Sequence, residues 1–301
     1  NDKAFQTSSH QYSQFRLIMY LVNFKLPTAM IRSLLRFFTV LIVTGLVCLG
    51  NIMPAAAQVE TTNIPNPQQE LGELVQKAFE ATNEGKFPLA ESFWTQIIEK
   101  FPEQAAAWSN RGNSRVSQNN LKAAISDYEK AMELVPNAPD PYLNRGTALE
   151  GLGRWEEAIA DYNRVLELDP KDPAAYNNRG NAEAGLGKWE QAITDYAKAF
   201  EIAPEYAFAR ANHALALYQN GQTKEAIRNM KNIVRRYPQF ADMRAALTAC
   251  LWQAGQRGEA ESNWVAAIGL DSRYKDIDWV TNTRRWPPVA VSALDKFLHL
   301  Q

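Results

Sequence analysis

The chain has 301 residues, 46% of them hydrophobic, so it is long enough to bury a substantial core. Its formal net charge is -1, which excludes the strong overall positive charge typical of nucleic-acid-binding proteins. We therefore expect no nucleic-acid partner.

The first 57 residues predict export. We interpret residues 1–29 as an extension upstream of Met30. Within 30–57, Arg32 and Arg36 precede an apolar run over 37–49, and small residues follow at 55–57. These are the three parts of a secretory signal peptide, so cleavage is expected after Ala57. The alternative is an uncleaved membrane anchor through residues 34–53, although the apolar run is short for a span.

A polar segment and a long internal repeat follow. Residues 58–70, which include Pro65 and Pro67, are typical of a linker. The tripeptide Asn-Arg-Gly then recurs every 34 residues, and the whole region repeats with that period without insertion or deletion. The six blocks are 71–104, 105–138, 139–172, 173–206, 207–240 and 241–274.

Each block predicts a pair of antiparallel helices. Small residues at block positions 8 and 20 allow two helices to approach closely, and a large residue at position 24 fills the space beside them. Glycine or asparagine at position 15 ends the first helix, and proline at position 32 stops the second in five blocks. One hairpin cannot bury its apolar face alone, so the blocks must stack.

The period and these positions resemble the tetratricopeptide repeat family, over residues 71–274. The resemblance implies an all-α, right-handed α-solenoid of six helical hairpins, with a concave groove lined by the first helices. Departures from the family pattern, such as Thr248 at position 8 and Ser272 at position 32, gather toward the C-terminal end.

Residues 275–301 predict a C-terminal cap. Pro287 and Pro288 suit a helix start, and Val291, Leu294 and Leu298 give the following helix one apolar face. A Trp-Pro-Pro tail on an exported repeat protein is similar to tetratricopeptide proteins of the thylakoid lumen in cyanobacteria and chloroplasts. We therefore expect an exported location, in the thylakoid lumen or the periplasm.

The asparagine of Asn-Arg-Gly lies on the stripe of the first helix that faces away from the position-8 glycine. The resemblance places this stripe on the groove, where an amide can pair with a peptide backbone through both its donor and its acceptor. The alternative is that these amides bond to neighbouring helices or water. The candidate peptide-binding asparagines are Asn110, Asn144, Asn178 and Asn212 at position 6, with Asn113 and Asn181 at position 9.

Aromatic residues enter the same face in the last two blocks. Phe208 and Tyr218 are candidates for side-chain specificity toward a client. For Trp252 we favour contact with the C-terminal cap, with Trp279 as the expected partner.

A basic stripe follows helical spacing on the second helix of block 207–240. It consists of Lys224, Arg228, Lys231 and Arg235. The stripe is a candidate contact for an anionic membrane surface or an acidic partner. The alternative is an ordinary solvated face.

The sequence contains no phosphate-binding loop, no metal-ligand cluster and no paired catalytic groups. We expect no enzyme activity, no cofactor, no metal and no small-molecule substrate. The predicted function is a protein-binding scaffold that holds a peptide or protein client in its groove, in the assembly of a thylakoid, photosynthetic or envelope complex. The alternative is a membrane-tethered structural subunit of a larger complex.

Overall fold

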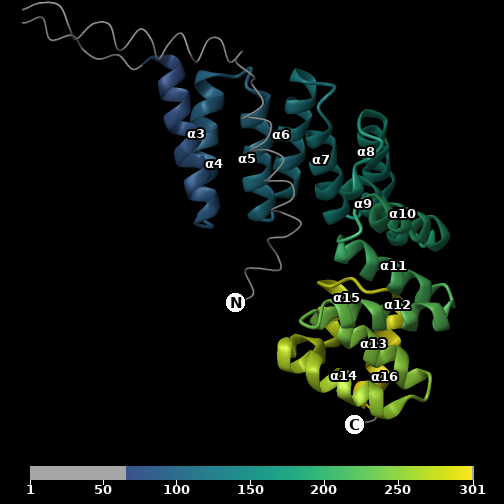
Figure 1. The fold of residues 1–301 in the computed structure, drawn as a ribbon. Coiled ribbons are helices and arrows are strands. Elements are labelled where there is room, and N and C mark those ends of the chain that lie inside the picture. The colour runs from purple at the N-terminus through teal and green to yellow at the C-terminus, as the bar shows by residue number, and fades with distance from the viewer. Residues whose placement is uncertain (1–65, 300–301) are drawn as a thin grey trace, which may run out of the picture. The chain divides into compact units, whose positions relative to one another are not determined.

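The structure is a computed structural model that describes residues 66–299; the predicted extension and signal segment lie outside this range. The described residues form helices and contain no strand (Figure 1). The first helices of the hairpins are α3 (Pro67–Asn83), α5 (Ala105–Ser117), α7 (Pro139–Gly151), α9 (Pro173–Gly185), α11 (Ala207–Gln219) and α13 (Ala241–Gln253). The second helices are α4 (Phe87–Lys100), α6 (Leu121–Leu134), α8 (Trp155–Leu168), α10 (Trp189–Ile202), α12 (Thr223–Arg236) and α14 (Arg257–Leu270).

Each helix packs on the next one along the chain, both within a hairpin and between hairpins. The first helices of neighbouring hairpins also contact one another directly, from α5 to α13, more extensively than the second helices do. We call the surface formed by the first helices the first-helix face. The prediction of an all-α solenoid of six hairpins with a C-terminal capping helix is confirmed.

The turn inside every hairpin has the same backbone conformation. Position 15 has a positive φ in all six, from 59° at Asn119 to 78° at Gly221. The left-handed conformation ends the first helix and allows the chain to reverse into the second. Glycine adopts it without steric cost and asparagine tolerates it, which explains the restriction of position 15 to these two residues.

Close approach explains the glycine of Asn-Arg-Gly. A Cβ added to Gly146 would lie 2.6 Å from Cε1 of Tyr162, whose ring is fully buried. Gly112 and Gly180 meet Tyr128 and Tyr196 in the same way, at 2.7 and 2.8 Å. The predicted pairing of a small position 8 with a large position 24 is therefore present in all three repeats.

The first helix begins earlier than the predicted start of the repeats at residue 71. Oδ1 of Asn66 accepts a hydrogen bond from the backbone N–H of Gln68 at 3.1 Å, and Pro67 occupies the first helical turn. This cap extends α3 into the segment predicted as a linker.

The C-terminal segment continues through η1 (Ser272–Lys275), α15 (Ile277–Asn282) and α16 (Pro288–His299). Helix α16 packs against α13 and also contacts α11, so it covers the first-helix face of the last two hairpins. The ring of Phe297 packs edge-on against Trp252 and Trp264, with centroids 5.1 and 5.3 Å away. The cap contact predicted for Trp252 is present, but Phe297 makes it, whereas Trp279 packs against Tyr274.

Candidate functional site

The arginine of Asn-Arg-Gly makes an ion pair inside each of the three hairpins that contain this tripeptide. Arg145 donates from Nε and Nη2 to the two carboxylate oxygens of Asp161, at 2.8 and 2.6 Å. Asp161 is 3% exposed, so this bidentate pair is largely shielded from water. The equivalent pairs are Arg111 with Asp127 and Arg179 with Asp195.

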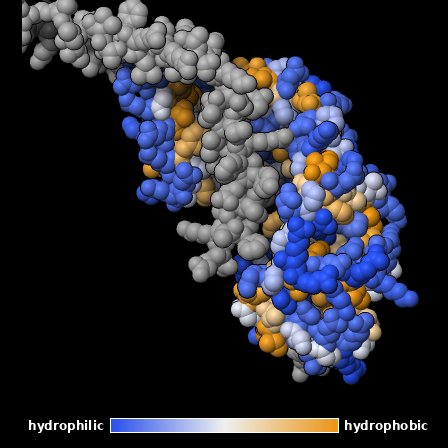
Figure 2. Space-filling view, in the orientation of Figure 1, coloured by the Kyte–Doolittle hydropathy of each residue, from blue (hydrophilic) through white to orange (hydrophobic). Residues whose placement is uncertain are grey.

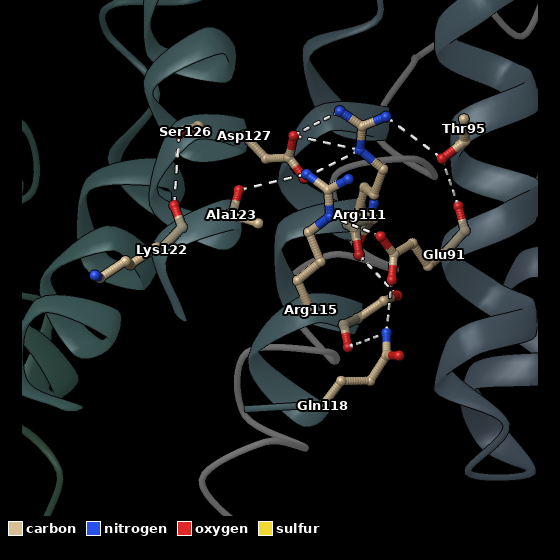
Figure 3. Close-up of polar contacts among 11 residues, drawn as sticks. Glu91, Thr95, Arg111, Arg115, Gln118, Lys122, Ala123, Ser126 and Asp127 are labelled. Atoms are coloured by element: carbon tan, nitrogen blue, oxygen red, sulfur yellow. Dashed lines mark hydrogen bonds and ion pairs between the residues drawn. The ribbon is translucent and has the colours of Figure 1, made fainter. Parts of the chain in front are cut away.

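In the second hairpin the pair is part of a larger network (Figure 3). Arg115 donates from Nη1 to Asp127 at 2.8 Å and from Nε to Glu91 of α4 at 2.8 Å. The Nη1 of Arg111 also reaches Oγ1 of Thr95 on α4, at 3.4 Å. These bonds join the first hairpin to the second, so the arginines serve packing within and between repeats.

The predicted asparagines of the later repeats form a network across neighbouring first helices. Nδ2 of Asn212 on α11 donates to Oδ1 of Asn177 and of Asn181 on α9, both at 3.1 Å. Asn181 also accepts from the hydroxyl of Tyr196 at 3.0 Å. Asn178 contacts Oγ1 of Thr147 on α7 at 3.5 Å. Much of their hydrogen-bonding capacity therefore joins repeats together, as the alternative interpretation of these amides predicts.

The remaining asparagines differ from one another. Asn110 is 7% exposed and donates to the carbonyl of Ala106 in its own helix, so it offers little to a client. Asn113 accepts from the hydroxyl of Tyr128 at 2.8 Å. Asn144 is half-buried and makes no side-chain hydrogen bond to another described residue. Among the candidate asparagines, it is the one whose side-chain amide has no hydrogen-bond partner among the described residues.

Two carboxyl groups on the first helices have unusual environments. Burial raises the pKa of Glu150 to about 7, against the effect of a short hydrogen bond from the Tyr162 hydroxyl. Burial and the neighbouring Asp195 raise the pKa of Glu183 to about 7, against the effect of Arg179. Oε2 of Glu183 is buried without a hydrogen-bond partner among the described residues. Both groups change charge near neutral pH.

Neither of the two aromatic candidates is fully exposed. Tyr218 is 6% exposed, and burial raises its pKa to about 12. It cannot reach a client without displacing its neighbours, so it supports the core. Phe208 is half-buried and packs edge-on against Phe240, with centroids 5.6 Å apart.

The basic stripe on α12 is partly neutralised. Arg228 pairs with Glu225 at 2.9 Å, and Lys231 pairs with Glu259 of α14 at 2.7 Å. Arg235 donates to Asn232 at 2.8 Å, and Lys224 is exposed. Two of its four charges therefore have carboxylate partners, so less positive charge remains to attract an anionic lipid surface. No helix among residues 66–299 has the length and apolar character needed to cross a membrane.

A few large apolar side chains of the described residues are exposed. On the face drawn in Figure 2, hydrophobic residues lie in small groups among hydrophilic ones. The exposed examples are Leu89, Val135, Leu152, Val265, Leu270 and Val289. Such scattered residues are ordinary and indicate no docking site.

Sequence reasoning missed the partners of the arginines and asparagines. Asp127, Asp161 and Asp195 recur at block position 23, sixteen residues after each arginine. Two oppositely charged residues repeated in register, one on each helix of a hairpin, were the available signal. No comparable signal marks Asn177 or Glu150, because each has its role in one repeat only.

The stacked hairpins form a solenoid, and the same Arg–Asp ion pair repeats inside three of them. Residues 112–153 and 151–187 match a model described as TPR repeat, and residues 173–206 and 212–274 match two models described as tetratricopeptide repeat. The chain belongs to the tetratricopeptide repeat family. No curated protein gives a significant match to it.

Solved structures share this fold. A tetratricopeptide repeat protein from Parabacteroides merdae is 22% identical with a TM-score of 0.58, over 77% of this chain and 86% of its own. The APC/C hetero-tetramer Cut9-Hcn1 contains a chain that is 17% identical with a TM-score of 0.60, over 77% and 42%. MamA from Desulfovibrio magneticus is 20% identical with a TM-score of 0.51, over 56% and 95%. Repeats of this family indicate a scaffold for protein–protein interaction and favour a non-enzymatic role.

Proposed function

We propose that the first-helix face over α5, α7 and α9 binds an extended segment of a protein client. The observation that carries this proposal is Asn144, a half-buried amide on α7 with no hydrogen bond to another described residue. An amide of this kind can donate to a peptide carbonyl and accept from a peptide N–H, whatever the client's side chains.

A neighbouring amide on α9 supports the same surface. Asn178 retains one amide N–H beyond its contact with Thr147. Helix α16 covers the last two hairpins, so the proposed client lies on the hairpins before them.

The proposed setting is an exported compartment, either the thylakoid lumen or the periplasm, with a client that is a complex under assembly. The targeting pattern in residues 30–57 motivates this location. N-terminal sequencing of the native protein tests it. A chain that starts at Gln58 supports export and cleavage, whereas an intact segment 34–53 in the membrane fraction supports the tethered subunit instead.

Site-specific photo-crosslinking in the native host tests the client surface. A photoreactive residue at position 144 should capture a defined protein, and the same residue at exposed position 156 on α8 should not. Equal capture at both positions, or capture at position 156 alone, contradicts binding on the first-helix face.

The captured client then allows the role of the amide to be measured. Asn144→Ala should weaken binding about fivefold, the value of one ordinary hydrogen bond, and should leave the melting temperature unchanged. Asn282→Ala, an exposed asparagine in α15, is the matched control and should bind as the wild type does. Unchanged affinity in Asn144→Ala removes this amide from the proposal.

A further inference from the structure

The fifth hairpin lacks the ion pairs that the three hairpins before it carry. In block 207–240, His213 takes the place of the arginine and Asn229 that of its aspartate partner. Three earlier blocks also carry an ion pair at positions 26 and 29 of the second helix, namely Lys130–Glu133, Arg164–Glu167 and Lys198–Glu201. Here these positions hold Asn232 and Arg235. The aspartate of position 23 and the glutamate of position 29 are therefore both absent from this hairpin.

Two further positions gain positive charge. Position 30 is Leu or Ile in the three earlier blocks, and it is Arg236 here. Position 4 is Trp or Tyr in those blocks, and it is Arg210 here. Nε of Arg210 bonds to the carbonyl of Pro204 at 2.8 Å, as the hydroxyl of Tyr142 bonds to the carbonyl of Pro136. The arginine thus keeps the structural bond of the residue it replaces.

These changes surround a pocket of about 390 Å³ between α10, α11 and α12. Its polar lining consists of Arg210, His213, Asn229, Asn232, Arg235 and Arg236. It contains no carboxylate, and none of its three guanidinium groups forms an ion pair with a described carboxylate. The volume lies within the usual range for small-ligand pockets.

Aromatic rings hold two of the guanidinium groups in place. Arg210 lies over the ring of Phe200, 4.7 Å from its centroid, and Arg236 lies over Tyr237 at 5.5 Å. The ring of His213 packs edge-on against Phe200. Stacked arginines lose little freedom on binding and present their N–H groups in a fixed fork, which suits a tetrahedral oxyanion.

We propose that this pocket binds a small soluble molecule through a phosphate monoester dianion. Three guanidinium groups without carboxylate partners favour a dianion over a single carboxylate, which one arginine satisfies. Amides of Asn229 and Asn232 and the imidazole of His213 supply further donors beside the arginines. The pocket involves the second helices α10 and α12, so its ligand does not compete for the proposed client contacts of α7.

Titration calorimetry with phenyl phosphate, in chloride buffer, tests the proposal. We expect saturable binding at one site, about tenfold tighter than that of phenyl sulfate, because the sulfate ester carries one charge fewer. Inorganic phosphate should compete. Absence of saturable binding, or equal affinity for the two esters, overturns the proposal.

Variants copied from the other repeats make the test specific. Arg210→Tyr and Arg236→Leu install residues that stand at the same positions in neighbouring hairpins, so the fold should tolerate them. Each should weaken phenyl phosphate about tenfold, the cost of one charged hydrogen bond. Lys224→Gln is the matched control, because it removes one charge from exposed α12 surface outside the pocket. If the control substitution weakens phenyl phosphate binding equally, the attraction is non-specific electrostatics and binding in the pocket is refuted.

A second readout does not depend on calorimetry. Burial lowers the pKa of His213, Glu225 on α12 raises it, and Arg210 on α11 lowers it. Arg235 and Arg236 also line the pocket. A dianion bound beside the ring should raise the pKa of His213, which NMR of the imidazole C–H signals measures. If the pKa of His213 does not change at saturating phenyl phosphate, the anion binds elsewhere and the proposal is refuted. Phosphatidic acid vesicles test for a lipid ligand. If the protein binds these vesicles even with either arginine substituted, and does not bind phenyl phosphate, it recognises a lipid surface and the proposal is refuted.

Discussion

At the scale of the residue, glycine at position 8 acts through the space it leaves. A methyl group on Gly146 would overlap the buried ring of Tyr162, with 2.6 Å between Cβ and Cε1. Alanine improves helix propensity by about 1 kcal/mol, but overpacking a rigid core costs about 1–3 kcal/mol. We therefore expect Gly146→Ala to lower the free energy of unfolding by about 1 kcal/mol in urea denaturation, since the two effects oppose each other.

The matched control for this change is Gly72→Ala. Gly72 lies inside α3, and a Cβ there meets no atom within 4 Å. Only the propensity effect remains, so this variant should be more stable than the wild type by about 0.5–1 kcal/mol. If both variants move stability in the same direction, close approach does not explain the glycine of Asn-Arg-Gly.

At the scale of the helical element, the Arg145–Asp161 pair ties the two helices of one hairpin together. Asp161→Asn should cost roughly 2 kcal/mol, because it leaves the partly buried guanidinium with only the exposed Glu129 carboxylate, 3.5 Å away. The sixth hairpin already uses Leu247 and Asn263 at these two positions. Arg145→Leu combined with Asp161→Asn should therefore be more stable than Asp161→Asn alone.

A double-mutant cycle in denaturant measures this coupling. It requires the two single variants and the double variant beside the wild type. Additive effects would show that the two side chains stabilise the hairpin independently and that the ion pair contributes nothing of its own.

The same hairpins show what the sequence predicts and what it does not. Features set by backbone geometry repeat in register, so position 15 with its positive φ and position 8 with its close contact were predictable from one sequence. Side-chain partners depend on which residues face each other after stacking. Asn212 bonds to Asn177 on a neighbouring helix, a contact that no periodicity encodes. The asparagines lie on the first helices, but the sequence does not predict their bonds to other repeats.

At the scale of the whole described chain, the cap determines how much of the first-helix face is open. Its anchor is Asp242 on α13, which is 6% exposed. Oδ1 of Asp242 accepts from the Tyr274 hydroxyl at 2.7 Å, from Nε of Arg284 at 2.9 Å and from Nε1 of Trp286 at 3.0 Å. A single carboxylate oxygen thus holds η1 and the loop before α16 against the last hairpin.

Asp242→Ala should therefore loosen the cap while the hairpins before it remain folded. It leaves three donors without an acceptor, at a cost of about 3 kcal/mol, so the population with an open cap should rise about 100-fold. Trypsin cleavage after Arg284 and Arg285 should accelerate by that factor under conditions where helical circular dichroism is unchanged. Asp278→Ala, an exposed acid in α15, should be cleaved at the wild-type rate. If Asp242→Ala is cleaved no faster, or if cleavage follows unfolding of all helices, the cap is not a separate unit and α16 belongs to the last hairpin as firmly as α14 does.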